Sequence, residues 1–525
     1  MPDATSEVEM VQQIQATFMQ FDRRAEKVSQ DILARTFVDA EPLFIQLSSR
    51  NHQVFYGRRG TGKTHALKYL AETLRARQDM PIYVDLRSVG SNGSIYSDGK
   101  RTLAERASRL IIDVLEAVEQ ELTAIAIEQI DNARDAQQIT MRLDDLGAAI
   151  RSVEVKGTVE EEKTTSEAQE TNKTLSGKSD MKTVELSGGF GRKNAVTDMN
   201  RTKHSGEASI SIDFGPLQGA LSGLVDVLGS PTIWLLIDEW SEIPIDLQPY
   251  LADLIRRTIL PQPRMIVKIA AIEHRSQFAE LGSGGSYVGI EIGADVTADI
   301  NLDDFVVYDV DQRRATEFFK NLIFKHYQVG ERANPLIDTA DKLISAAFTQ
   351  VTAFEEYVRA IEGVPRDALN LAAAMGRIAF GRKIGVTDVR KAAREWYQQD
   401  KMSVTKSAPV LADVLNHIIN EVIENRRTRA FLFPAASSST EIDRLYDARL
   451  LHLLKKSIAS NDEPGRRYHV YKIDYGCYVD LISTSRAPGG LLAADEGTYV
   501  DVPPDDYRSI RRAILKPEEI IPYQA

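Results

Sequence analysis

The sequence predicts an α/β fold, a parallel sheet with helices on both faces, followed by an all-α unit and a smaller mixed unit. The short apolar run Gln53–Tyr56 ends directly at Gly57, as expected for a strand that feeds a glycine turn. The helical stretch His65–Leu74 and a second apolar run, Pro81–Leu86, follow it. Together they form a strand–loop–helix–strand unit, which is the building block of parallel sheets.

Length and composition indicate a globular chain of several domains. At 525 residues the chain is longer than one hydrophobic core usually serves, so two to four domains are expected. No apolar run approaches the roughly 20 residues that span a bilayer, and the polar residues 1–9 do not resemble a signal peptide. The single cysteine, Cys477, cannot form an internal disulfide, which agrees with a reducing compartment. We therefore expect a cytoplasmic protein without a membrane partner.

The first half of the chain divides into a leading helical segment and a core with a polar insertion. Residues 1–36 carry Ile14, Phe18 and Phe21 at helical spacing, which predicts an amphipathic helix. The core is expected over 37–305. Residues about 154–209 are rich in Thr, Ser, Lys, Glu and Gly, which indicates a mobile insertion that ends in a hairpin.

Regular elements resume after the insertion and complete the α/β core. The expected elements are a helix over Leu217–Leu228, a strand over Thr232–Ile237, a helix over Leu247–Leu260 and a strand over Met265–Ile272. Residues 306–405 then form an all-α unit, because their apolar residues recur at helical spacing. Its expected helices include Ala315–Phe324, Phe354–Ile361, Arg366–Phe380 and Thr387–Gln399.

The final stretch, 411–525, mixes helices and strands in an order that matches a winged helix-turn-helix domain. A helix over Leu411–Asn425 and a strand over Ala430–Phe433 open it. The expected elements that follow are helices over Glu441–Ala448 and Leu450–Ile458 and strands over Tyr468–Asp474 and Cys477–Ser483.

One motif carries specific chemistry. The pattern G-x-x-x-x-G-K-[ST] is satisfied by Gly57, Arg58, Arg59, Gly60, Thr61, Gly62, Lys63 and Thr64, with His65 next to it. Such a P-loop turns backbone N–H groups toward phosphate oxygens, and its lysine reaches the β and γ phosphates. Thr64 would offer its hydroxyl to Mg²⁺. We assign this segment to binding of ATP and Mg²⁺, because a chance match between a predicted strand and a predicted helix is rare.

A second motif supplies the acidic residues that a P-loop needs for Mg²⁺ and for the attacking water. The apolar strand ends in Asp238 and Glu239. We expect Asp238 to hold Mg²⁺ through its water shell and Glu239 to polarise the attacking water, so the predicted activity is ATP hydrolysis. Two acids at a strand end otherwise merely begin a loop, and the P-loop makes that alternative much weaker.

A third motif, Gly363-Val364-Pro365-Arg366, opens a helix of the all-α unit. Proline suits the first turn of a helix, and Arg366 then sits where it can swing onto a γ-phosphate. With this motif the chain resembles AAA+ ATPases of the origin-recognition and initiator clade, termed ORC-like, and the related STAND signalling ATPases. The resemblance covers roughly Phe37–Gln399, and it implies that the all-α unit is a lid and Arg366 the sensor-2 residue.

The chain departs from that family at the sensor-1 position, expected at the end of the strand Met265–Ile272. Glu273 and His274 stand there instead of an Asn or Thr, so the role stays unassigned with these two as weak candidates. The resemblance also places an arginine that acts in trans on the preceding helix, where Arg256 and Arg257 lie. Two arginines at a helix C-terminus also simply complement the helix dipole, and both alternatives remain open.

Two functions fit these motifs. The first is an ATP-switched protein that associates with double-stranded DNA through the winged helix. Its net charge of −12 means that any DNA contact is local, and the basic candidates are Arg426, Arg427, Arg429, Lys455, Lys456, Arg466 and Arg467. The second is a STAND-like scaffold ATPase that acts through protein–protein assembly or homo-oligomers, for example in phage defence. A kinase for small molecules is the least supported function.

Overall fold

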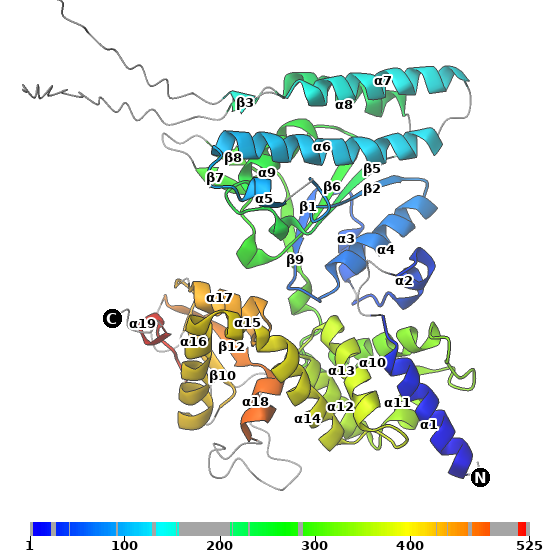
Figure 1. Ribbon diagram of the computed structural model, residues 1–525, viewed down its shortest axis with the longest axis vertical. Helices are drawn as coiled ribbons and strands as arrows, with labels where there is room; N and C mark the ends of the chain where they lie inside the picture. Colours follow the sequence, from blue (N-terminus) through cyan, green and yellow to red (C-terminus); the bar gives the residue numbers. More distant parts are fainter. Residues whose placement is uncertain are drawn as a thin grey trace, which may run out of the picture.

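The computed structural model describes residues 4–22, 28–40, 42–90, 93–128, 133–153, 155–156, 211–212, 214–228, 232–281, 287–426, 428–437, 439–459, 465–482 and 513–520. Figure 1 shows a core built on a sheet, with the all-α unit and the C-terminal unit lying side by side against one end of it. None of the described helices is long and apolar enough to cross a membrane.

The core is a five-stranded parallel sheet in the order β2-β5-β6-β1-β9. Its strands are β1 (Gln53–Tyr56), β2 (Met80–Asp85), β5 (Ile233–Asp238), β6 (Met265–Ala271) and β9 (Thr297–Asn301). Strands β5 and β6 are buried along their whole length, as expected for central parallel strands covered on both faces. The predicted strands are confirmed, and β9 is an additional, more polar edge strand that the sequence pattern did not reveal.

Helices cover both faces of this sheet, as predicted. On one face α4 (Lys63–Ala76) packs in the same apolar cluster as Phe55, Trp234 and Ala270. The other face belongs to a second cluster with Val54 and Val267. The helices that contribute to this second cluster are α5 (Gly93–Tyr96), α6 (Leu103–Glu128), α7 (Ala133–Arg151), α8 (Gly215–Val227) and α9 (Gln248–Thr258).

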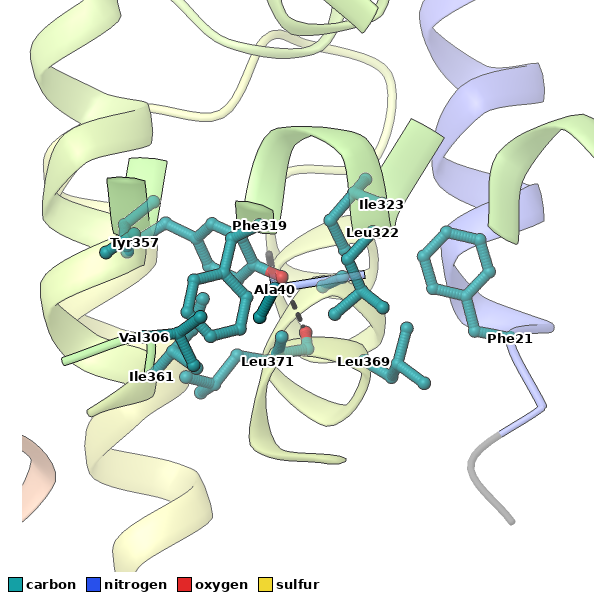
Figure 2. Close-up of a cluster of buried hydrophobic side chains, with 14 of the residues drawn as sticks. Phe21, Ala40, Val306, Phe319, Leu322, Ile323, Tyr357, Ile361, Leu369 and Leu371 are labelled. Carbon is teal, nitrogen blue, oxygen red and sulfur yellow. Dashed lines mark hydrogen bonds between the residues drawn. The ribbon is translucent and has the colours of Figure 1, made fainter. Parts of the chain in front are cut away.

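The all-α unit follows the core and shares its first apolar cluster. Its helices are α10 (Gln312–Gln328), α11 (Ala340–Ala347), α12 (Val351–Ile361), α13 (Pro365–Ile378) and α14 (Val386–Trp396). Figure 2 shows side chains of α10 and α12 meeting those of α13, with Phe21 beside them. The predicted leading helix is α1 (Ala4–Met19), and it packs on α13, α11 and α10 rather than on the sheet. The lid is therefore completed by the chain's first helix.

The C-terminal unit is a three-stranded antiparallel sheet in the order β10-β12-β11 with helices around it. Its strands are β10 (Ala430–Pro434), β11 (Leu451–Ala459) and β12 (Arg467–Ile473). Its helices are α15 (Ser403–Ser407), α16 (Pro409–Ile419), α17 (Thr440–Asp447), α18 (Tyr475–Ile482) and α19 (Pro517–Ile520).

Two predicted elements of this unit are wrong. Leu450–Ile458 was expected as a helix of the winged helix-turn-helix, and it is strand β11 because it pairs along β12. The run Leu451–Leu454 is apolar at nearly every position, so its period does not separate strand from helix. Cys477–Ser483 was expected as a strand, and its described part belongs to helix α18. Aromatic and β-branched residues favour strands by propensity, but here they pack against α14 and α12.

The polar insertion lies almost entirely outside the described residues. Its base is described: β3 (Val155–Lys156) pairs antiparallel with β4 (Ser211–Ile212). A second small ribbon, β7 (Ala279–Leu281) with β8 (Tyr287–Gly289), lies against α9. Arg427 of the predicted basic cluster also lies outside the described residues.

Candidate functional site

The glycine-rich loop joins β1 to the first turn of α4. Gly60 has φ of +93° and Gly62 has φ of +102°, the left-handed region that glycine enters without strain. The backbone N–H of Gly57 donates to the carbonyl of Ala271 at 3.2 Å, which ties the loop to the end of β6. These contacts aim the loop and the N-terminus of α4 into one cavity, where a helix end favours anions.

Lys63 lies beneath this loop and is nearly buried. Its ammonium donates to the carbonyl oxygens of Gly57 at 2.7 Å and Arg58 at 3.2 Å. Burial lowers the pKa of Lys63, whereas the nearby carboxylates of Glu239 and Asp238 raise it. The structure therefore brings the loop lysine and the two acids together, as the sequence predicted.

The two acids follow β5 in different environments. Asp238 is fully buried, and its carboxylate accepts from the Tyr83 hydroxyl at 2.8 Å and from the Glu239 backbone N–H at 2.8 Å. Glu239 has φ of +56°, a strained backbone for a residue with a side chain. Burial and the charge of Asp238 raise the pKa of Glu239, and Lys63 and Arg87 oppose that rise. Glu239 lines the same cavity as Lys63.

A cavity of about 670 Å³ joins the loop, the sheet end and the lid. Its polar lining includes Lys63, Thr64, Glu239 and Arg366. Apolar and aromatic residues from the N-terminal segment and from α10 and its C-cap also line it, namely Phe21, Val28, Ile32, Leu33, Leu322 and Val329. The sequence did not reveal this wall, because the residues that form it are distant along the chain.

Arg366 enters the cavity from the lid, at the start of α13. Its backbone N–H donates to the carbonyl of Gly60 at 3.1 Å. A Cβ added to Gly60 would lie 2.9 Å from the Cβ of Arg366, so the loop and the lid are in direct contact. The predicted sensor-2 residue thus lies at the cavity, next to the glycine-rich loop.

Other residues assigned to nucleotide binding lie at or near the cavity in different ways. Arg59 lines it and pairs with Glu242, a residue that the sequence did not single out. His65 lines it, and its ring contacts the Leu33 carbonyl at 2.8 Å while burial lowers its pKa. The Thr61 hydroxyl donates to the Arg58 carbonyl at 2.9 Å and so shapes the loop from within.

Arg58 and the two arginines of α9 do not line the cavity. The Arg58 side chain turns away from it and pairs with Asp303. Arg256 pairs with Asp295 at 3.0 Å, and its guanidinium lies over the ring of Tyr287. Arg257 pairs with Asp253 at 2.7 Å. Both α9 arginines are thus engaged by carboxylates of their own chain.

The weak candidates for sensor 1 lie in the contact between the core and the C-terminal unit. Glu273 accepts from the Asn301 amide at 3.2 Å and pairs with Lys456 at 2.7 Å. His274 lies 3.4 Å from a carboxylate oxygen of Asp443. Neither residue lines the cavity, so the geometry gives them no contact with a nucleotide there.

A parallel sheet with a P-loop, an acid-tipped central strand and a helical lid defines an α/β fold of the AAA+ type. The chain belongs to the ORC-CDC6-like family, whose model matches residues 21–328. No curated protein matches the chain.

Two of the similar solved structures are origin-recognition proteins. The Orc1 protein of Aeropyrum pernix in complex with DNA matches with a TM-score of 0.32 and 14% identity, over 86% of this chain and 94% of that chain. Drosophila ORC bound to DNA matches with a TM-score of 0.28 and 10% identity, over 87% of this chain and 92% of that chain.

Proposed function

We propose that the protein binds and hydrolyses ATP in this cavity and uses its nucleotide state as a switch. One observation carries the proposal: the loop lysine Lys63, the strand-end acid Glu239 and the lid arginine Arg366 line a single cavity. The three groups come from three separate parts of the chain. Their convergence is what hydrolysis of a phosphoanhydride needs: a cation for the phosphates, an acid for the water and a mobile cation on the lid.

The donor groups fit a magnesium ion bound together with the nucleotide, because Thr64 lines the cavity and the buried Asp238, which does not line it, immediately precedes Glu239, which does. Thr64 and Asp238 are the residues that would hold it, and the ion would neutralise phosphate charge. Among the described residues no group of three or more His, Cys, Asp or Glu can hold a metal by itself. Phosphate oxygens and water would therefore complete the coordination, as is usual for magnesium in nucleotide sites.

Glu239 is the proposed base that orients the attacking water. Its raised pKa makes its carboxylate a better proton acceptor than an exposed glutamate. Arg87, 3.6 Å from Glu239, and Lys63 partly oppose this rise in its pKa.

Two substitutions separate binding from hydrolysis. Lys63→Ala is expected to abolish ATP binding in a calorimetric titration with magnesium, and Glu239→Gln is expected to bind ATP but hydrolyse it at least about 100-fold more slowly. Glu317→Gln and Lys320→Ala, a partly exposed ion pair on α10 outside the cavity lining, serve as matched controls with wild-type behaviour. Tight ATP binding by Lys63→Ala would contradict the proposed site.

We further propose that the C-terminal unit contacts duplex DNA through the β11–β12 hairpin. Its exposed basic residues are Lys455, Lys456, Arg466 and Arg467. These residues are basic candidates that the sequence already offered, and Lys455 and Lys456 lie on strand β11 rather than on the expected helix. Clustered cations on one hairpin provide the local contact with phosphates that the acidic chain requires.

Salt-dependent duplex binding with and without ATP tests this contact. Replacing Arg466 and Lys455 with glutamine is expected to weaken binding and to reduce the slope of log K against log salt by about 0.9 per lost phosphate contact. The matched control replaces Lys320 and Lys342, which form ion pairs on the lid, the first half-buried and the second exposed. If the protein binds no duplex at low salt, both with and without ATP, the proposed DNA contact is refuted.

A nucleotide-timed assembly without DNA is the second candidate function. One observation favours it: Lys456 of the hairpin forms an ion pair with Glu273 of the core. This basic residue therefore already contacts protein rather than being reserved for DNA. In such an assembly Arg256 or Arg257 would act in trans after leaving its own-chain partner. ATP-dependent oligomers on a sizing column in the absence of DNA would support this function over the first.

A further inference from the structure

Arg58, the second residue of the glycine-rich loop, reaches away from the cavity into the contact between the core and the C-terminal unit. It is 4% exposed. Its Nε donates to Asp303 at 2.6 Å, and its backbone N–H donates to the other oxygen of the same carboxylate at 2.8 Å. Asp303 thus fixes both the main chain and the side chain of Arg58.

The far end of Arg58 contacts the C-terminal unit. Its Nη1 donates to the Leu451 carbonyl at 3.1 Å and lies 3.3 Å from a ring nitrogen of His452. The guanidinium also lies over the ring of Tyr446, 4.3 Å from its centroid. A buried cation held by an aromatic face and a carbonyl is a specific docking contact.

The near end of Arg58 contacts the phosphate-binding lysine. Its carbonyl oxygen accepts from the ammonium of Lys63 at 3.2 Å. An ammonium has three N–H donors, and Lys63 directs two of them at loop carbonyls, which leaves one for a phosphate oxygen. One residue therefore joins the lysine of the nucleotide site to the C-terminal unit.

The C-terminal unit also holds the lid turn that carries Arg366. The residues on either side of the Gly363–Arg366 motif are the buried acids Glu362 and Asp367. Their basic partners in the C-terminal unit are Arg429 and Lys472 for Glu362, and Arg449 for Asp367. Separating a buried ion pair leaves an uncompensated charge. These contacts therefore oppose movement of the lid turn relative to the C-terminal unit.

We propose that Arg58 is a positioning residue that couples the nucleotide site to the docking of the C-terminal unit. While the unit is docked, Arg58 holds the loop in the geometry that binds ATP, and displacement of the unit weakens nucleotide binding. By linkage, bound nucleotide favours the docked unit by the same factor. The inference rests on the proposed ATP function and adds the residues through which that site is regulated.

The coupling is tested by measuring the affinity of the full chain for ATP after a substitution in the C-terminal unit. Tyr446→Leu removes the aromatic face without touching the cavity, and it is expected to weaken ATP binding by about 5-fold or more, the lower end of typical coupling factors. In an Arg58→Met background the same change is expected to add less than about twofold, because both substitutions break one connection.

Arg275→Met is the matched control. Arg275 pairs with Asp447 at 2.8 Å and so also joins the core to α17, but it lies outside the loop and the cavity. Its affinity for ATP is expected to stay within about twofold of the wild type. If Arg58→Met does not fold, the comparison of Tyr446→Leu with Arg275→Met decides alone.

The outcomes separate the two proposals. Wild-type protein that binds no ATP refutes the proposed function itself. Wild-type binding with an unchanged affinity in folded Tyr446→Leu overturns the coupling alone, and so does an equal loss in Arg275→Met. A selective loss in Tyr446→Leu supports the coupling through Arg58.

Discussion

Glu239 illustrates how backbone strain serves a site at the scale of one residue. Its left-handed φ of +56° costs about 1–3 kcal/mol for a residue with a side chain. The same turn lets its backbone N–H donate to the carboxylate of Asp238, which orients that acid. The sequence identified both acids, but a glutamate at position 239 does not predict a left-handed backbone there. Strain of this kind becomes visible only in three dimensions.

Lys268 gives a prediction at the same scale. It is fully buried in β6, where its ammonium donates to the Gln53 amide oxygen at 3.0 Å. Burial lowers its pKa to about 7, and the charge of Asp299 only partly opposes this. The unfolded chain then binds more protons than the folded chain between about pH 7 and the ordinary lysine pKa of about 10.4.

The free energy of unfolding is therefore expected to increase as pH rises from about 7 to 10, by up to about 1.4 kcal/mol per pH unit. Urea unfolding at several pH values in this window measures it. Lys268→Met is expected to remove this contribution and to be more stable than the wild type near pH 7. A wild-type profile that Lys268→Met reproduces without change would contradict the assignment.

At the scale of elements, period and propensity located most of the core and the lid. Strands β1, β2, β5 and β6 and the lid helices lie where the sequence placed them, because each is either a short apolar run or a clear helical repeat. The errors concern β11 and α18, where tertiary pairing overrides a local pattern that fits both structures. Edge strand β9 was missed because its residues alternate weakly and are mostly polar.

Helix α13 supports a prediction about the lid. Its first turn presents Arg366 to the cavity, and the backbone N–H of that residue contacts the glycine-rich loop. Arg366→Ala is expected to leave ATP affinity largely intact and to slow hydrolysis by about 10- to 100-fold, because the lost cation acts on developing phosphoryl charge. Titration and single-turnover hydrolysis measure the two effects.

Arg377→Ala provides the control on the same helix. Arg377 lies near the other end of α13 and pairs with Glu395 at the surface. It is expected to hydrolyse ATP like the wild type. Normal turnover in Arg366→Ala would refute the sensor-2 role.

At the scale of the whole molecule, the first helix completes a unit encoded some 300 residues later. The amide nitrogen of Gln15 donates to the carbonyls of Ala379 at 2.9 Å and Arg382 at 2.7 Å, and its oxygen accepts from Gly381 at 2.8 Å. The sequence predicted an amphipathic helix but not its partner. The local sequence pattern shows which face of a helix is apolar, whereas contacts between distant parts of the chain decide what that face packs against. The same limit hid the outward turn of Arg58 and the cavity wall formed by the N-terminal segment.

Gln15→Ala tests how tightly this helix is attached. The substitution leaves buried backbone groups at the end of α13 without their partner, so a loss of about 1–3 kcal/mol in unfolding free energy is expected. Denaturant unfolding measures it. Gln12→Ala, one turn earlier on α1, is the control, because its side chain is partly exposed. Equal stability of Gln15→Ala and the control would contradict the attachment.

The short ribbon of β3 and β4 marks a place where the chain could be shortened or a domain inserted. Lys156 and Ser211 face each other in register, so the chain leaves and re-enters the core at one point. A two-residue Asn-Gly turn closes such an antiparallel pair without strain. Splicing Lys156 to Ser211 through that turn would keep β3 and β4 paired, and the same junction is a site at which a reporter domain could be inserted.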